Sequence, residues 1–194
     1  VNNLKTPFQD DYIEVPCGKC VQCLKAKISE RLCTLYMEYM SRGDYAIFVT
    51  LTLDDMVFLK DMSGVSKDHV RPLLEEMRKN PKLKYFLTSE YGSTTDRPHY
   101  HMMAFGFYNL KQAEDFFLAN WKLGQISVTE CNDRRFTYVA SCHITKCSHI
   151  PERVDFDTGE IVPCNKPFTV SSRGLGYSFV KSHYKKLYKQ GVLY

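Results

Sequence analysis

The sequence contains no long apolar stretch. No run of 18 or more apolar residues occurs among its 194 residues, so it predicts no membrane-spanning helix. Residues 1–15 lack a basic start followed by an apolar segment, so no secretion signal is expected there. We therefore expect neither a membrane partner nor export.

A large excess of one charge sign is also absent. The 26 Lys and Arg residues against 22 Asp and Glu give a net charge of +4, which permits a nucleic-acid partner without requiring one. Hydrophobic residues make up 44% and charged residues 25%, the usual composition of a globular domain. A chain of this length buries enough surface to fold without disulfides or a metal. We therefore expect residues 1–194 to form a single domain.

Eight cysteines are present, but the chain shows no export signal that would take them to an oxidising compartment. We therefore expect free thiols or metal ligands rather than disulfides. The 13 Tyr and 12 Phe residues can fill a core and also leave aromatic rings that can stack on nucleic-acid bases.

Strands and helices follow one another without a regular βαβ repeat. Runs rich in β-branched and aromatic residues predict strands at 46–53, 84–91, 99–107 and 125–130, and a hairpin at 154–162. Apolar residues spaced three and four apart predict helices at 21–40, 66–79, 110–121, 134–146 and 176–189. Pro72 predicts that the second helix begins close to Asp68 or His69, and residues 1–16 are expected to form an irregular arm. This order favours an α+β fold with a largely antiparallel central sheet flanked by helices.

Two histidines flank a tyrosine in the strand predicted at 99–107. Strand side chains alternate between faces, so His99 and His101 project from the same face, close enough to share one cation. A chance His-x-His pair is common, so the motif alone leaves a structural role equally open. Thr50 and Thr52 likewise share one face of the strand at 46–53, where they are candidates for DNA contact near the metal.

Glu90 stands near the end of the strand that precedes this pair. The turn at 92–98 returns the chain, so its carboxylate can lie beside His99 and His101 on the neighbouring strand. Two imidazoles and one carboxylate form a site that takes a divalent metal and leaves positions open for substrate oxygens. The alternative for Glu90 is a solvated carboxylate at a strand end. A cupin-like site is excluded, because Ala104 to Phe107 occupy the positions where its Glu would be.

The helix predicted at 134–146 carries a candidate nucleophile and a candidate cation. Tyr138 and Cys142 share one face, one turn apart, and the long stem of Lys146 can reach the same patch. A tyrosine is a poor nucleophile at its usual pKa, but a nearby cation and a metal on the phosphate lower the barrier. The alternative is that Tyr138 is a packed aromatic of an amphipathic helix.

Several motifs occur together and in a fixed order. They are Phe48–Thr52 (FVTLT), Glu90–Gly92 (EYG), Arg97–His101 (RPHYH), and Tyr138 with Lys146; Cys17–Cys23 and Ser172–Gly176 lie outside them. In this set the chain resembles the HUH endonucleases that start rolling-circle replication, and within them the replication-initiation proteins of gokushovirus-type microviruses, which are single-stranded DNA phages. The resemblance spans most of the chain.

This resemblance implies an HUH-like fold and a metal-dependent DNA endonuclease and strand transferase. His99, His101 and Glu90 would hold Mg²⁺ or Mn²⁺, and Tyr138 would attack the scissile phosphate with Lys146 nearby. The products would be a 5′-phosphotyrosine link and a free 3′-OH that primes synthesis by the host replication machinery. The implied partner is single-stranded DNA at a replication origin, and the implied location is the host bacterial cytoplasm.

One position departs from the pattern that the resemblance implies. Relatives of this kind often carry two tyrosines one helical turn apart, whereas here Cys142 stands at the second position. If a second tyrosine normally resolves the replicated circle, this chain must use the new 3′-OH or a second copy of itself. A thiolate nucleophile at Cys142 is an alternative that the family chemistry does not favour.

A cluster of cysteines lies in the N-terminal arm, residues 1–23. Cys17, Cys20 and Cys23 have the short spacing of a zinc knuckle, but a structural zinc takes four ligands. The fourth ligand would come from around the predicted hairpin, from Cys147, Cys164 or His149. A ferredoxin-type iron–sulfur cluster is excluded by Lys27, and buried or loop thiols are the alternative. Cys33 is expected to be a small buried residue on the apolar flank of the first helix.

The last predicted helix, within 176–190, is basic. Lys181 and Lys185 are among its four lysines and are interleaved with aromatic residues, a combination that holds single-stranded DNA. A solvated helix face is the alternative. Arg173, between glycines and serines, and Arg97, in the RPHYH motif, are further candidates for DNA contact.

Two other functions remain open. One is a related HUH relaxase or transposase-like strand transferase, which would use the same residues on a different DNA structure. The other is a non-catalytic zinc-bearing regulator that binds nucleic acid, in which the histidine pair is structural.

Overall fold

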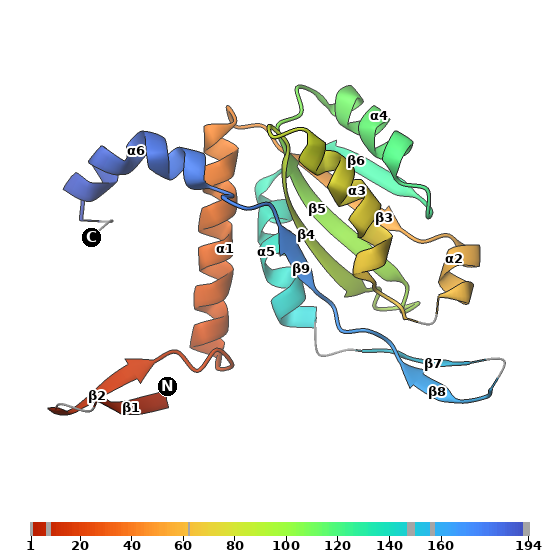
Figure 1. The fold of residues 1–194 in the computed structure, drawn as a ribbon, viewed down its shortest axis with the longest axis horizontal. Coiled ribbons are helices and arrows are strands. Elements are labelled where there is room, and N and C mark those ends of the chain that lie inside the picture. Colours follow the sequence, from red (N-terminus) through yellow and green to blue (C-terminus); the bar gives the residue numbers. More distant parts are fainter. Residues whose placement is uncertain (1, 7–8, 62, 147–149, 156–157, 192–194) are drawn as a thin grey trace.

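The computed structural model describes residues 2–6, 9–61, 63–146, 150–155 and 158–191 (Figure 1). A five-stranded antiparallel sheet lies at the centre of these residues and helices cover both of its faces. The α+β fold with a central antiparallel sheet flanked by helices, predicted from the order of elements, is confirmed. None of the helices in the described part is long and apolar enough to span a bilayer.

The central sheet has the strand order β6-β3-β5-β4-β9. Its strands are β3 (Ile47–Thr52), β4 (Lys84–Tyr91), β5 (Pro98–Phe105), β6 (Ile126–Glu130) and β9 (Thr169–Ser171). Each neighbouring pair is antiparallel, and the turn between β4 and β5 makes them a hairpin. The four strands predicted in this region are confirmed. The sequence does not predict β9, because three residues are too few to show an alternating pattern.

Six helices accompany the sheet: α1 (Val21–Ser41), α2 (Asp55–Lys60), α3 (Lys67–Lys79), α4 (Leu110–Asn120), α5 (Asp133–Lys146) and α6 (Tyr177–Lys189). Five of them confirm the predicted helices. The sequence does not predict α2, which has six residues and begins where the Asp54 side chain accepts a hydrogen bond from the Val57 N–H. Its first-turn acid and last-turn lysine complement the helix dipole.

The prediction that Pro72 marks the start of the second helix is wrong. α3 begins at Lys67, and the Ser66 hydroxyl caps it by accepting a hydrogen bond from the Asp68 N–H at 3.2 Å. Pro72 therefore lies inside the helix. Four buried apolar residues bind this helix to the sheet and offset the backbone hydrogen bond that proline cannot donate; they are Val70, Leu73, Leu74 and Met77.

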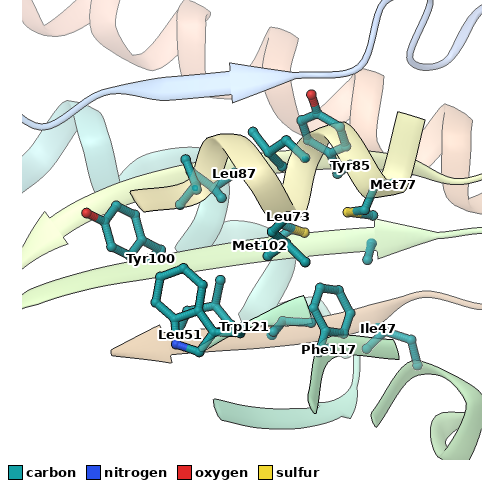
Figure 2. Packing of buried hydrophobic residues seen from close by; sticks show 14 of the residues in the cluster. Ile47, Leu51, Leu73, Met77, Tyr85, Leu87, Tyr100, Met102, Phe117 and Trp121 are labelled. Carbon is teal, nitrogen blue, oxygen red and sulfur yellow. The ribbon is translucent and has the colours of Figure 1, made fainter. Parts of the chain in front are cut away.

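Alternating residues of the sheet build two separate cores. One face packs against α3 and α4 through Leu51, Leu87 and Met102, as Figure 2 shows. The other face packs against α1 and α5, and its core includes Met103 and Phe105. A strand of this sheet therefore presents one set of side chains to α3 and α4 and the other to α1 and α5.

Tyr100 fixes β5 to the α3 side of the sheet. Its ring is fully buried, and its hydroxyl accepts a hydrogen bond from the Ser66 N–H at 2.9 Å. His69 Nδ1 lies 2.6 Å from the same hydroxyl, and its Nε2 is hydrogen-bonded to Asp61. This network ties β5 to the start of α3 through a residue between the two histidines of the candidate site.

Two small hairpins lie outside the central sheet. β7 (Glu152–Val154) pairs with β8 (Ile161–Pro163), which confirms the predicted hairpin. The expectation of an irregular arm at 1–16 is wrong, because β1 (Asn2–Thr6) and β2 (Gln9–Val15) form an antiparallel pair beside the lower end of α1 in Figure 1. A two-stranded ribbon is held by backbone hydrogen bonds, so it leaves little apolar periodicity in the sequence to detect.

Candidate active site

His99 and His101 lie on the α5 side of the sheet, on the face opposite Tyr100. Their rings are parallel within 5° and their centroids are 6.2 Å apart. The two imidazoles therefore share one face, as the alternation of strand residues predicts. Burial lowers the pKa of His99, so its ring is neutral at physiological pH and keeps a lone pair for a ligand.

The strand register brings the predicted partners beside the histidines. On one side, Glu90 of β4 is opposite His99. On the other side, β3 places Thr52 opposite His99 and Thr50 opposite His101. The Thr50 hydroxyl lies 3.1 Å from His101 Nδ1, whereas the Thr52 hydroxyl donates to the backbone oxygen of Gln125.

Glu90 is the group at which the site converges. Its side chain is buried, and its Oε1 accepts a hydrogen bond from the Tyr138 hydroxyl at 2.5 Å and lies 3.1 Å from His101 Nε2. Its Oε2 accepts a hydrogen bond from the Cys142 thiol at 2.5 Å. Both carboxylate oxygens are therefore engaged by residues of β5 and α5.

Tyr138 and Cys142 lie on the face of α5 that packs against β4 and β5. Their spacing of four residues stacks them one turn apart, so both reach the same carboxylate. The Tyr138 hydroxyl is also 3.3 Å from His101 Nε2. Burial, followed by the hydrogen bond to Glu90 and its charge, raises the pKa of Tyr138 well above the usual value for a phenol. Lys146 is the last residue of α5, and its side chain is outside the described part of the structure.

Phe48 is a site residue that the sequence pattern does not single out. Its ring stacks on His101 with a centroid distance of 5.7 Å and meets the edge of Tyr138 at 6.5 Å. The Arg135 guanidinium lies over the same ring, 5.2 Å from its centroid. The detectable signal is its alternation with Thr50 on β3, which places both residues on the site face.

Both histidines are oriented by contacts of Nδ1, which suits metal ligands. His99 Nδ1 lies 2.8 Å from the backbone oxygen of Arg97, and His101 Nδ1 faces Thr50. This leaves the two Nε2 atoms for a ligand, the arrangement usual for imidazoles that bind metals. In the described residues, however, the only three or more His, Cys, Asp or Glu donors that lie within 4.8 Å of one another are three cysteines elsewhere. His99, His101 and Glu90 thus form a more open set of donors.

Those three cysteines are Cys17, Cys20 and Cys23, at the start of α1. The sulfurs of Cys17 and Cys23 are 3.8 Å apart, and the Cys20 N–H donates to the Cys17 sulfur at 3.3 Å. Hydrogen bonds from the backbone of Lys19 and Cys20 lower the pKa of Cys17 to about 6. A thiolate is the form that binds metal, so the cluster is chemically suited to a thiophilic ion such as zinc.

The structure does not supply the fourth zinc ligand from Cys164. That residue is buried in the core with Tyr91, and its N–H donates to the backbone oxygen of Pro151. The prediction of Cys164 as a ligand is therefore wrong, because its sulfur fills apolar space behind the central sheet. Cys147 and His149 lie outside the described residues. Cys33 was expected to be buried but is exposed.

The predicted DNA-contacting residues are spread over three parts of the molecule. Arg97 forms an ion pair with Asp55 of α2 and lies near the site through its neighbour His99. Arg173 lies in the turn after β9, where its backbone oxygen accepts a hydrogen bond from Lys84 Nζ at 3.1 Å. Lys181 and Lys185 are on α6, which extends from α1 on the side away from the sheet in Figure 1, so the structure does not bring them to Glu90.

The chain was compared with protein families and known proteins. The family model for replication-associated protein ORF2 matches residues 46–146, which hold all the residues of the candidate site. Replication-associated protein VP4 of Bdellovibrio phage phiMH2K is 25% identical over 209 residues, which cover 92% of this chain. Replication-associated protein ORF4 of Chlamydia phage 1 is 27% identical over 72% of this chain. Replication-associated protein ORF2 of Spiroplasma virus 4 is 31% identical over 50% of it.

These relatives are longer than the region that they share with this chain. The match spans 61%, 42% and 32% of the lengths of the three relatives, in the same order. No solved structure shows significant similarity to the chain. The family match covers more than half of the chain and includes α5 and the strands that carry His99, His101 and Glu90. The chain therefore belongs to the family of replication-associated protein ORF2.

Proposed function

We propose that this protein is a rolling-circle replication initiator that nicks and joins single-stranded DNA at an origin. The observation that carries the proposal is the convergence of Tyr138, Glu90 and His101 within hydrogen-bonding distance, with His99 parallel to His101. A phenol beside a histidine–carboxylate set is a sufficient kit for phosphoryl transfer, in which catalysis is mostly positioning and charge neutralisation. The names of the similar phage proteins support a role in replication.

His99, His101 and Glu90 would hold Mg²⁺ or Mn²⁺ in this proposal. The fit is supported by the engaged Nδ1 atoms, which leave both Nε2 atoms available, and by the carboxylate next to one of them. Open coordination positions suit oxygen ligands from a phosphate. When bound, the ion would polarise the scissile phosphate and neutralise its charge.

Tyr138 is the proposed nucleophile. Its oxygen forms a bond to phosphorus, and the bond from phosphorus to the 3′ oxygen of the preceding nucleotide breaks. Glu90 Oε1 already accepts the Tyr138 hydrogen bond and would receive its proton, and the leaving 3′ oxygen takes up a proton to become a 3′-OH. The 5′-phosphotyrosine link conserves the phosphodiester energy, so the joining step is the same reaction in reverse.

The raised pKa of Tyr138 gives this arrangement a built-in safeguard. Burial and the neighbouring Glu90 charge keep the phenol protonated at physiological pH. Positive charge on the Glu90 side of the site favours the phenolate, since it offsets both effects. Tyr138 is thus expected to attack only when the site carries its cation.

Cys142 is proposed as a positioning residue, because its thiol is committed to Glu90. With no tyrosine at this position, resolution of the replicated circle falls to the new 3′-OH or to a second copy of the protein. Thr50, Thr52 and Arg97 are proposed to contact DNA near the scissile phosphate.

More distant parts of the chain have proposed roles as well. Arg173, Lys181 and Lys185 would contact DNA farther from the scissile phosphate, and Lys146 would supply positive charge at the end of α5. The 3′-OH would be extended by host replication proteins, which places the reaction in the host bacterial cytoplasm.

A structural zinc is proposed at Cys17, Cys20 and Cys23. Support comes from the convergence of the three sulfurs and from the lowered pKa of Cys17. Zinc there would fix the β1–β2 hairpin to the start of α1. The remaining position would be filled by Cys147, His149 or a ligand from another molecule.

Covalent capture of DNA tests the proposed function. The protein is incubated with Mn²⁺ and labelled single-stranded oligonucleotides that tile the genome encoding it, and adducts are resolved on a denaturing gel. Tyr138→Phe should lose the adduct and keep DNA binding, while Tyr108→Phe, at an exposed tyrosine, should keep both. Mass spectrometry of the peptide joined to DNA identifies the attacking side chain. An adduct of full yield on Tyr138→Phe would refute the assignment.

A second measurement separates an enzyme from a non-catalytic zinc-bearing regulator. His99→Ala with His101→Ala should abolish both Mn²⁺ binding, measured by calorimetry, and DNA cleavage. If DNA binding depends on zinc while neither Mn²⁺ binding nor an adduct occurs in the unmodified protein, the regulator is the better description.

A further inference from the structure

Two adjoining cavities lie at the edge of the central sheet, away from the candidate active site. One has a volume of about 570 Å³ and lies between the end of α3 and the start of β4, and the other has about 500 Å³ and faces α1. They share Ser171, Ser172 and Arg173 in their walls, so they form one continuous hollow around the end of β9. We call this hollow the edge groove.

The edge groove is lined mainly by cations. Its basic residues are Lys27, Arg31, Arg78, Lys84 and Arg173, and its acidic residue is Glu30. Within the described residues, none of these five cations forms an ion pair with a carboxylate. Arg42, Arg71, Lys79, Arg97 and Lys111 do form such pairs elsewhere. Uncompensated positive charge is therefore concentrated at this edge of the sheet.

Uncharged partners hold these side chains in place. Arg78 donates a hydrogen bond to the Tyr85 hydroxyl at 2.8 Å, and Arg31 donates to the backbone oxygen of Ala140 at 3.3 Å. Lys84 donates to the backbone oxygen of Arg173. Such contacts orient a cation and leave its charge available to an anion, which lowers the entropic cost of binding one.

The turn at 173–176 adds backbone donors to the same place. Gly174 and Gly176 have φ angles of +67° and +79°, and a Cβ atom at Gly174 would meet only the Tyr177 Cβ, at 3.8 Å. In the described structure, the N–H groups of Arg173, Gly174 and Leu175 have no backbone hydrogen-bond acceptor. Successive N–H groups in a turn that includes left-handed residues form a concavity that binds anions.

We propose that the edge groove is a second binding site for single-stranded DNA, which holds backbone phosphates outside the cleavage site. Lys84 and Glu90 lie at opposite ends of β4, six residues and therefore roughly 20 Å apart. A phosphate in the groove is thus too far away to be the scissile one. The cations line two connected hollows instead of a broad face, which suits one flexible phosphate chain. The inference rests on the proposed function for the identity of the polymer.

The salt dependence of DNA binding tests this site. Binding of a labelled oligothymidylate is measured by fluorescence anisotropy at several salt concentrations for the unmodified chain and for the double variant Lys84→Ala, Arg173→Ala. Each phosphate contact with single-stranded DNA contributes about 0.7 to the slope of log K against log salt, so the slope should become shallower by about 1.4. The matched control is Lys111→Ala, Lys122→Ala on and after α4, which removes the same charge and should leave the slope unchanged.

A fold defect is excluded with a milder variant. Arg173 is exposed in a turn, so Arg173→Ala alone should leave the thermal midpoint unchanged and lower the slope by about 0.7. An unchanged slope in either groove variant, or an equal loss in the control, overturns the proposal. Duplex DNA that binds as tightly as oligothymidylate, with the same sensitivity to the variants, overturns the assignment to single strands.

Failure of the proposed catalytic function gives a different result. A short oligonucleotide that covers only the nick should form its adduct equally well with the groove variants and the unmodified chain. If no adduct forms with any protein but the slope still falls in the groove variants, the groove stands and the nuclease does not. If the adduct forms and depends on Tyr138 while the slope is unchanged, the nuclease stands and the groove does not.

Discussion

Glu90 is the residue on which most of the candidate site depends. Its two oxygens serve a phenol, an imidazole and a thiol, so the carboxylate has a single orientation that all three partners support. Charged acceptors make stronger hydrogen bonds than neutral ones, which explains why a buried carboxylate is tolerated beside an apolar core.

The thiol of Cys142 should therefore contribute to stability through Glu90. Cys142→Ala removes a donor from a buried carboxylate, and we expect it to lower the free energy of unfolding by about 1–3 kcal/mol. Cys142→Ser keeps a donor at the same position and should lose less. Urea unfolding curves with unchanged slopes measure both effects. Equal losses for the two variants would show that packing, and not the hydrogen bond, is what matters there.

Two cysteines should differ in reactivity for an electrostatic reason. Burial raises the pKa of Cys131 to about 12, so at pH 8 its thiolate fraction is about one in ten thousand. Cys33 is exposed. Iodoacetamide at pH 8 should modify Cys33 and spare Cys131, and Cys131 should react only as the pH approaches 12 or the protein unfolds. Peptide mass spectrometry measures both rates, and rapid modification of Cys131 at pH 8 in the folded protein would contradict the shift.

At the scale of helices and strands, Glu38 joins α1 to α6. Its side chain is fully buried, its Oε1 pairs with Arg42 at 2.7 Å, and its Oε2 accepts a hydrogen bond from the Gly176 N–H at 2.8 Å. This places the N-terminus of α6 on the side of α1. The lysines of α6 that are proposed to contact DNA are thus positioned by one carboxylate.

Glu38→Ala should loosen α6 before it affects the sheet. The variant leaves the Gly176 N–H without its acceptor and Arg42 without its partner, and we expect a loss of about 2–4 kcal/mol. Hydrogen exchange should quicken in α6 and at its junction with α1, while amides of β4 and β5 keep their protection. Glu75→Ala, at an exposed position of α3, is the matched control and should change neither. Uniform loss of protection would mean that Glu38 supports the whole fold.

Elements with a clear period could be predicted from the sequence, and elements without one could not. α1, α3 and α4 bury a stripe of residues, so their spacing reports the helix. β9 has three residues and α2 has six, too few for a period to appear. β1 and β2 pair through the backbone, whose hydrogen bonds leave no trace in side-chain patterning.

The candidate site divides in the same way. The alternation in β5 and the tight turn before it place His99, His101 and Glu90 together, because a hairpin fixes the register of its two strands. The position of Tyr138 follows from how α5 crosses the sheet, which no local spacing contains. It was expected only from the resemblance to HUH endonucleases. The edge groove was missed for the same reason, since it joins residues of α1, α3, β4 and the turn after β9.

At the scale of the whole molecule, the cysteine cluster lies at the far end of α1 from the start of α6 (Figure 1). A metal there acts on the arrangement of the N-terminal hairpin and is separate from the chemistry at Glu90. The two metal requirements should therefore be separable by experiment.

Removal of zinc should weaken folding and leave the nicking chemistry intact. Protein purified with zinc should contain one ion per chain by native mass spectrometry, and Cys20→Ser should lose it. A zinc chelator should lower the thermal midpoint of the unmodified chain, since an ion that binds only the folded state stabilises it, and should leave that of Cys20→Ser unchanged. With Mn²⁺ restored in excess, adduct yield should be equal in both. Zinc retained by Cys20→Ser would mean that the ion sits elsewhere.

The anchoring of Tyr100 behind the sheet limits how sequences of this kind can change in length. An inserted or deleted residue within β5 would turn both imidazoles toward α3 and α4 and push the phenol of Tyr100 out of its hydrogen bonds with Ser66 and His69. Gains and losses of residues are therefore confined to the turn at 92–97, whose backbone enters neither core. Diversification of the nicking specificity has to proceed by substitution along the strands and by remodelling of that turn.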